Sequence, residues 1–115
     1  MGYYKYAATP TFRGYDSYYG YYSGAEDYFS HMAGSYGGAG YDFHQADSPN
    51  CGANCSRVVW EAKGVYSTHL FASRAESIIN AHDPDKNALF LYMPFQAVHV
   101  PDQVFRTPTV FVCLA

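Results

Sequence analysis

The chain has 115 residues, and its 7 Lys and Arg against 10 Asp and Glu give a formal net charge of −3. This length accommodates one domain, and the slightly acidic balance excludes the basic surface that a nucleic-acid backbone requires. No run approaches the roughly 18 apolar residues of a membrane span, and residues 1–6 lack the apolar region of a secretory signal. We therefore expect no nucleic-acid partner, no membrane span and no signal peptide.

The first 41 residues differ in composition from the rest, since they contain 11 of the 13 Tyr and 8 of the 10 Gly. They form either a low-complexity adhesive segment or a loop-rich part of a folded domain with half-buried Tyr side chains. The sequence favours the folded interpretation, because non-repeating stretches such as 10–16 and 24–29 interrupt the Tyr-rich run. Residues 34–40 are expected to form a flexible loop. The Tyr residues of 15–22 would line a sugar site or, in the interpretation that we favour, pack in a core or interface.

The cysteines are odd in number, with Cys51, Cys55 and Cys113. A Cys51–Cys55 pair would close a small loop. The triplet Asn54-Cys55-Ser56 fits the N-glycosylation pattern, which makes Asn54 a candidate glycosylation site, although such triplets often arise by chance.

Residues 67–82 have the pattern of an amphipathic helix. Ser67 or Thr68 is expected to cap its start, and Pro84 prevents its continuation. The apolar side chains that share one face of this helix are Leu70, Phe71, Ala75, Ile78 and Ile79. The solvent-facing positions are Ser73, Glu76 and Asn80.

A turn at 83–87 leads into the apolar run Ala88–Met93, which predicts a strand buried on both faces. Helix, short turn and apolar strand are half of an α/β unit. In such folds the carboxyl end of a strand delivers polar groups to a crevice, and His99 follows this strand closely. His99 is therefore the best candidate for chemistry, although a single histidine without a partner cannot run a reaction.

The other titratable groups do not form a recognisable site. The remaining histidines, at positions 31, 44, 69 and 82, have spacings that match no compact metal-ligand motif. Glu26 and Asp27 are adjacent, and adjacent side chains of an extended chain point apart. We expect these two carboxylates to cap or pair locally, with Arg13 as a candidate partner.

Several pieces of the chain occur in the order and at the spacing of the arylsulfatases. They are TFRGYDSYYGYY (11–22), GAEDYFSH (24–31), YST with Phe71 (66–71), and LFLY with QAVH (89–99). On these motifs the chain resembles the middle of an arylsulfatase, closest to the arylsulfatase B group, the N-acetylgalactosamine-4-sulfatases and their relatives.

This resemblance implies a partial alkaline-phosphatase-like α/β fold, with an incomplete sheet, one clear helix and one clear central strand. Residues 1–104 would be an internal segment of a sulfatase N-terminal catalytic domain, and residues 105–115 a divergent tail. The family hydrolyses sulfate esters of glycosaminoglycans or aryl sulfates in lysosomes or outside cells. A sulfated small molecule or glycan is thus the partner implied for a full-length protein, and a lysosomal or extracellular location is implied with it.

Within the resemblance, His99 matches the histidine that contacts the sulfate and protonates the departing oxygen, a role that suits an imidazole. The family also uses formylglycine, made from the Cys of Cys-x-Pro-x-Arg, and a calcium ion held by Asp and Asn. Neither that motif nor Asp-Asn-Gly occurs in these 115 residues. We therefore expect the chain alone to be inactive as a sulfuric ester hydrolase. The alternative is a non-catalytic truncated isoform that acts as an interaction or structural protein.

Overall fold

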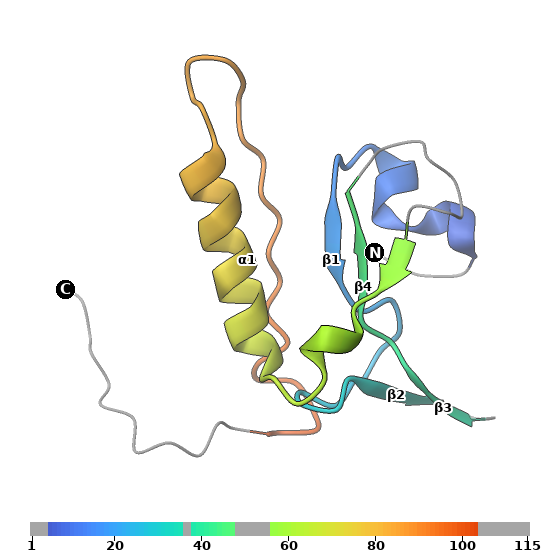
Figure 1. Cartoon of the computed structure of the whole chain (residues 1–115). Coiled ribbons are helices and arrows are strands. Elements are labelled where there is room, and N and C mark those ends of the chain that lie inside the picture. Colours follow the sequence, from blue (N-terminus) through green and yellow to red (C-terminus); the bar gives the residue numbers. More distant parts are fainter. Residues whose placement is uncertain (1–4, 36–37, 48–55, 104–115) are drawn as a thin grey trace, which may run out of the picture.

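A computed structural model of the chain describes residues 5–35, 38–47 and 56–103 (Figure 1). The elements are the 3-10 helices η1 (Tyr6–Ala8), η2 (Pro10–Arg13) and η4 (Trp60–Ala62), the strands β1 (Tyr18–Gly20), β2 (Met32–Ser35), β3 (Gly38–Tyr41), β4 (His44–Ala46) and β5 (Ser56–Val58), and the helix α1 (Ser67–Ala81). Over the same ranges, no helix has the length and apolar character needed to cross a membrane. The Tyr-rich first part contains several of these elements, which confirms the folded interpretation for the residues described.

Strands β1, β4 and β5 form an antiparallel sheet in that order. Tyr19 of β1 pairs with Gln45 of β4, and Gln45 pairs on its other side with Arg57 of β5. The central strand of this sheet thus comes from a region that the sequence pattern did not mark as a strand.

Strands β2 and β3 form a separate antiparallel hairpin, in which Gly34 faces Ala39 and Ser35 faces Gly38. The expectation of a flexible loop at 34–40 is therefore wrong for the residues described there. Because Gly and Ala carry little or no side chain, backbone hydrogen bonds hold this ladder together, and the sequence gives no hydrophobic alternation by which to recognise it.

The core lies between the sheet and α1. Phe43 and Val59 are 0 % and 2 % exposed, and Ala62 lies beside them. The Phe43 ring contacts Tyr19 edge to face, with centroids 5.0 Å apart, and stacks on Phe71 of α1 at 5.8 Å. Aromatic contacts therefore join β1, the residue that precedes β4 and the helix α1 into one unit.

Helix α1 confirms the helix predicted over 67–82, and its Ser73, Glu76 and Asn80 are exposed as predicted. The predicted cap is wrong. The residue before the helix, Tyr66, takes the N-cap position without a side-chain cap, and the Ser67 hydroxyl donates to Gln96 Oε1 at 2.7 Å instead. Ile79 is 55 % exposed, so the apolar face of α1 is only partly covered.

The chain turns after α1 as predicted, with the Lys86 N–H donating to the Asp83 carbonyl at 3.2 Å, and runs back beside the helix (Figure 1). The predicted buried strand Ala88–Met93 is wrong. These residues form no strand, and Phe90 is 77 % exposed. An extended segment becomes a strand only where a neighbour satisfies its backbone groups, and no strand in the described ranges pairs with this one.

The fold is thus a small mixture of helices and antiparallel strands, which is compatible with the α/β class. Asn54, Cys51, Cys55, Cys113 and the tail 105–115 lie outside the described residues.

Candidate functional site

His99 lies in a tight turn on the surface. Its N–H donates to the Gln96 carbonyl at 2.8 Å, which closes the turn formed by residues 96–99. The imidazole is exposed, and its Nδ1 lies 2.9 Å from the Val100 carbonyl. A carbonyl only accepts hydrogen bonds, so Nδ1 carries the proton in this contact. The neutral ring then presents Nε2 as its second polar atom.

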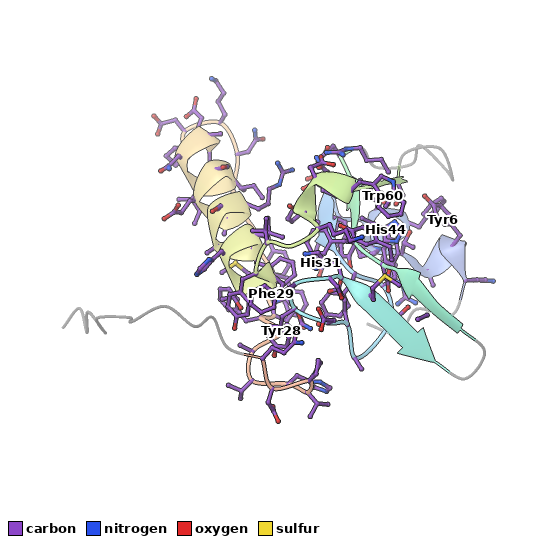
Figure 2. The ribbon with its side chains drawn as sticks, turned by 60° about the horizontal axis from the view of Figure 1, so that its bottom comes forward. Tyr6, Tyr28, Phe29, His31, His44 and Trp60 are labelled. Carbon is purple, nitrogen blue, oxygen red and sulfur yellow. The ribbon has the colours of Figure 1, made fainter. Side chains whose placement is uncertain are left out.

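Tyr28 attaches this turn to the segment 26–31. Its side chain is 1 % exposed, and its hydroxyl lies 2.7 Å from the carbonyl oxygen of His99 and 2.9 Å from that of Gln96. The ring is stacked on Tyr66, with centroids 5.6 Å apart. In Figure 2, Tyr28 and Phe29 lie beside the start of α1. The hydroxyl that holds the turn is therefore fixed by a packed aromatic ring.

Gln96 provides a second attachment and is 4 % exposed. Its Oε1 accepts from the Ser67 hydroxyl at the start of α1, and its Nε2 donates to the backbone carbonyl of Glu26. The amide thus joins three segments far apart in the sequence. Both ends of its side chain are satisfied, as a buried amide requires.

Asp27 organises the neighbouring bend. Its Oδ1 accepts from the N–H of Phe29 at 3.1 Å and from the N–H and hydroxyl of Ser30 at 2.6 and 2.8 Å, while Gln103 Nε2 donates to its Oδ2. Burial alone would raise the pKa of this carboxyl, but these hydrogen bonds to its charged form lower it to about 2. Asp27 therefore caps locally as predicted, whereas Arg13 donates to the Ala8 carbonyl and is not its partner.

Glu26 and His31 form a buried pair, each with a side chain that is 0 % exposed. The His31 Nε2 lies 3.0 and 3.1 Å from the carbonyls of Ala62 and Val65, so it acts as a donor. This leaves Nδ1 facing Glu26 Oε1 at 3.3 Å. Burial raises the pKa of Glu26 to about 7, against the lowering effect of the hydrogen bond and charge of His31. One proton, held between Glu26 Oε1 and His31 Nδ1, is enough to make this contact a hydrogen bond.

The remaining histidines do not form a metal site with these groups. His44 Nε2 lies 3.1 Å from Asp42 Oδ1, and the ring of His69 contacts Tyr66 edge to face. Across residues 5–35, 38–47 and 56–103, no three His, Cys, Asp or Glu side chains come close enough to hold a metal ion together. The calcium ion implied by the resemblance therefore does not fit the described part of this chain.

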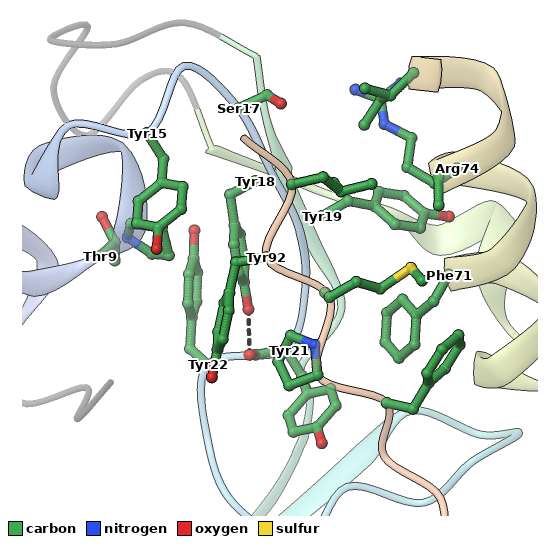
Figure 3. Close-up of a pocket in the computed structure, with 18 of the residues that line it drawn as sticks. Thr9, Tyr15, Ser17, Tyr18, Tyr19, Tyr21, Tyr22, Phe71, Arg74 and Tyr92 are labelled. Carbon is green, nitrogen blue, oxygen red and sulfur yellow. Dashed lines mark hydrogen bonds between the residues drawn. The ribbon is translucent and has the colours of Figure 1, made fainter. Parts of the chain in front are cut away.

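An aromatic pocket of about 440 Å³ lies between β1, α1 and the returning segment 91–95 (Figure 3). Tyr18 and Tyr22 are stacked at one wall, with centroids 4.9 Å apart, and the Tyr18 hydroxyl donates to the Tyr21 carbonyl. Burial raises the pKa of Tyr18, so this phenol stays neutral. The Tyr residues of 15–22 thus line a cavity, and one of them, Tyr19, also packs against the core.

Comparison with curated proteins finds a similar sequence. The chain is similar to arylsulfatase J of Mus musculus, with 37 % identity over 105 residues that cover 90 % of this chain. This chain spans 16 % of the length of that relative. The similarity supports the relationship to arylsulfatases that the motifs indicate. No family model matches the chain, and a search of solved structures finds no match.

The sequence pattern and the resemblance make His99 a candidate site residue, but they do not predict the residues that hold its turn. Gln96 is a polar residue inside an apolar stretch, a signal that marks buried hydrogen bonds, yet nothing in the sequence pairs it with Tyr28. The Glu26–His31 pair was missed because the four residues between its members have no helical or strand periodicity. The bend at 27–30 brings the two side chains together, and Asp27 holds that bend.

Proposed function

We propose that this chain forms part of an arylsulfatase, a sulfuric ester hydrolase, in which His99 contacts the sulfate group of the substrate. The observation that carries the proposal is the geometry of the His99 turn. The imidazole is exposed, its Nδ1 faces the Val100 carbonyl, and its second nitrogen has no partner among the described residues. Similarity to a relative named arylsulfatase J supports the reaction class.

The chemistry that follows is hydrogen-bond or proton donation by Nε2. When the ring is protonated, both nitrogens donate, so Nδ1 keeps its contact with Val100 while Nε2 donates to a sulfate oxygen or to the departing oxygen. The Val100 contact fixes the direction of the ring. His99 would therefore stabilise charge on the leaving oxygen without moving.

The nucleophile and the residues that bind calcium would belong to other parts of a longer protein. These 115 residues contain no Cys-x-Pro-x-Arg motif, and the described part of the chain holds no metal-type cluster. We therefore expect the chain alone not to hydrolyse aryl sulfates, with or without added calcium. The finer assignments are also proposals: the closeness to the arylsulfatase B group, a sulfated glycosaminoglycan as substrate, and a lysosomal or extracellular location.

The exposed apolar run fits the same proposal. Leu89, Phe90, Leu91, Tyr92 and Met93 are between 37 % and 77 % exposed. We infer that other parts of a longer sulfatase chain would cover this exposed segment. The same exposed run is the one observation that favours the alternative, a non-catalytic interaction protein.

A chimera tests the proposal. The matched segment of mouse arylsulfatase J is replaced by that of this chain, and turnover of p-nitrophenyl sulfate is measured with and without His99→Ala. We expect turnover by the chimera and a loss of about 100-fold in kcat/KM on His99→Ala, with no such loss on His82→Ala. A folded chimera without turnover, or one indifferent to His99, would contradict the proposal and leave the interaction protein as the better account.

A further inference from the structure

The turn that carries His99 has little packing of its own. Ala97, Val98, His99 and Val100 are all exposed, Val98 at 93 %. Burial of apolar side chains of the turn therefore contributes little to the position of the imidazole. The turn is held by polar attachments at its two ends, and both attachments reach the segment 26–31.

We propose that Tyr28 and Gln96 are positioning residues for His99, an inference that rests on the proposed contact between His99 and sulfate. The Tyr28 hydroxyl has one proton, and it lies within hydrogen-bond distance of two carbonyls, 2.7 Å from that of His99 and 2.9 Å from that of Gln96. These carbonyls belong to the last and first residues of the turn. The phenol therefore contacts both ends of the turn, with its one proton shared between the two carbonyls.

The Gln96 side chain attaches the turn to two further groups. Its side chain joins the Glu26 carbonyl to the Ser67 hydroxyl at the start of α1. The turn is thus tied to the 26–31 bend and to the helix, both of which belong to the packed part of the chain. Loss of the Tyr28 hydroxyl would leave the His99 end of the turn free to move while Gln96 still holds the other end.

Movement of the turn has a consequence at the ring. The contact from Nδ1 to Val100 keeps the proton of the neutral imidazole on Nδ1, whereas a solvated imidazole is not held in this tautomer. When the turn loosens, the Val100 contact weakens and the proton redistributes toward Nε2. Tyr28 therefore determines both the position of the His99 ring and which of its two nitrogens carries the proton.

The test uses the 115-residue chain and nuclear magnetic resonance. Tyr28→Phe removes the hydroxyl and keeps the ring stack on Tyr66. Tyr41→Phe is the matched control, because the Tyr41 hydroxyl also donates to a backbone carbonyl, that of Val59 at 2.6 Å, in another part of the fold. Two quantities are measured: the hydrogen-exchange rate of the His99 N–H, and the ring 15N shifts of His99, which report its tautomer. The Val59 N–H, which bonds to the Phe43 carbonyl at 2.9 Å, reports the core.

In Tyr28→Phe we expect the His99 N–H to exchange about tenfold faster and the tautomer to shift toward Nε2, with exchange of the Val59 N–H unchanged. Tyr41→Phe should leave both His99 signals unchanged. Gln96→Leu should produce the same pair of changes at His99. An unaltered His99 in Tyr28→Phe, an equal change at His99 and Val59, or a parent chain without a protected Val59 N–H would each overturn the inference.

These outcomes are separate from the fate of the proposed function. If His99→Ala leaves the chimera active while Tyr28→Phe shifts the His99 tautomer, the sulfate contact fails and the positioning of His99 stands. If the His99 tautomer is unchanged in Tyr28→Phe but the chimera needs His99 for turnover, the positioning role fails and the sulfate contact stands.

Discussion

Glu26 Oε1 and His31 Nδ1 face each other at 3.3 Å inside the molecule, with both side chains wholly buried. Burial, helped by the charges of Asp42 and Asp27, outweighs the lowering effect of His31 and raises the pKa of Glu26 from its ordinary 4.5 to about 7. Between these two values the folded chain binds a proton that the unfolded chain releases. This pair therefore contributes stability below pH 4.5 that is lost as the pH rises to 7.

The first prediction concerns Glu26→Gln, which mimics the protonated carboxyl and still offers a donor to His31. In the parent chain the free energy of unfolding should fall by up to about 3 kcal/mol between pH 4.5 and 7 from this group. In E26Q that fall should disappear, so the variant is the more stable chain at pH 8. Urea unfolding at several pH values measures this. Parallel pH profiles for the two chains would show that Glu26 is ionised throughout.

For Asp27, the adjacent carboxyl, the contribution to stability should change with pH in the opposite direction. Its pKa is lowered to about 2 from the ordinary 3.8, so its stabilisation is present above pH 3.8 and is lost as the pH falls toward 2. Asp27→Asn should reduce the free energy of unfolding at pH 7 by roughly 1–3 kcal/mol. The difference in this free energy between variant and parent should become smaller as the pH falls below 3.8. The exposed Asp85→Asn is the control and should change stability little. Equal losses in the two variants would refute the role of the 27–30 bend.

A glycine prediction tests the contact between β1 and α1. Gly20 has a φ of +147°, and an added Cβ would lie 3.4 Å from the Tyr18 hydroxyl and 3.5 Å from the Phe71 ring. Gly20→Ala should therefore destabilise the fold by about 1 kcal/mol or more. Gly24→Ala, where a Cβ meets open space, should have almost no effect. Thermal unfolding compares them, and a neutral Gly20→Ala would mean that β1 does not pack on Phe71 in this way.

Two phenylalanines should respond in contrasting ways to removal of their rings. Phe43 is 0 % exposed in the core, and Phe90 is 77 % exposed on the returning segment. Phe43→Ala should cost about 3–5 kcal/mol, whereas Phe90→Ala should cost less than about 0.5 kcal/mol. Phe90→Ala should also reduce self-association, measured by sedimentation, because an exposed apolar run invites aggregation. A costly Phe90→Ala would indicate that the segment 88–93 is buried in solution.

The sequence was most informative where the pattern was local and long. Helix α1 follows from the spacing of its apolar residues, and the turn after it follows from Asp83 and Pro84. Strands β1, β4 and β5 have three residues each, which is too short for alternation to show. The segment 88–93 has the composition of a buried strand, but pairing depends on a neighbouring strand, and composition does not supply that neighbour.

The candidate site, like the fold, could be predicted from the sequence only in its local features. The prediction of His99 as a candidate rests on its place after an apolar run and on the resemblance, both of which are visible in the chain itself. The hydrogen bonds that attach its turn to Glu26 and Tyr28 join residues about 70 positions apart. Such contacts depend on how the 26–31 bend, α1 and the returning segment pack together. No single-sequence pattern encodes that arrangement.

The most direct test of the sulfate contact compares two leaving groups in the arylsulfatase J chimera. If His99 donates a proton to the departing oxygen, His99→Ala should lower kcat/KM more for phenyl sulfate, a poor leaving group, than for p-nitrophenyl sulfate, which needs little assistance. We expect the two losses to differ by at least about tenfold. Equal losses would remove the proton-donor role, and no loss with either substrate would contradict the assignment of His99 to the sulfate site.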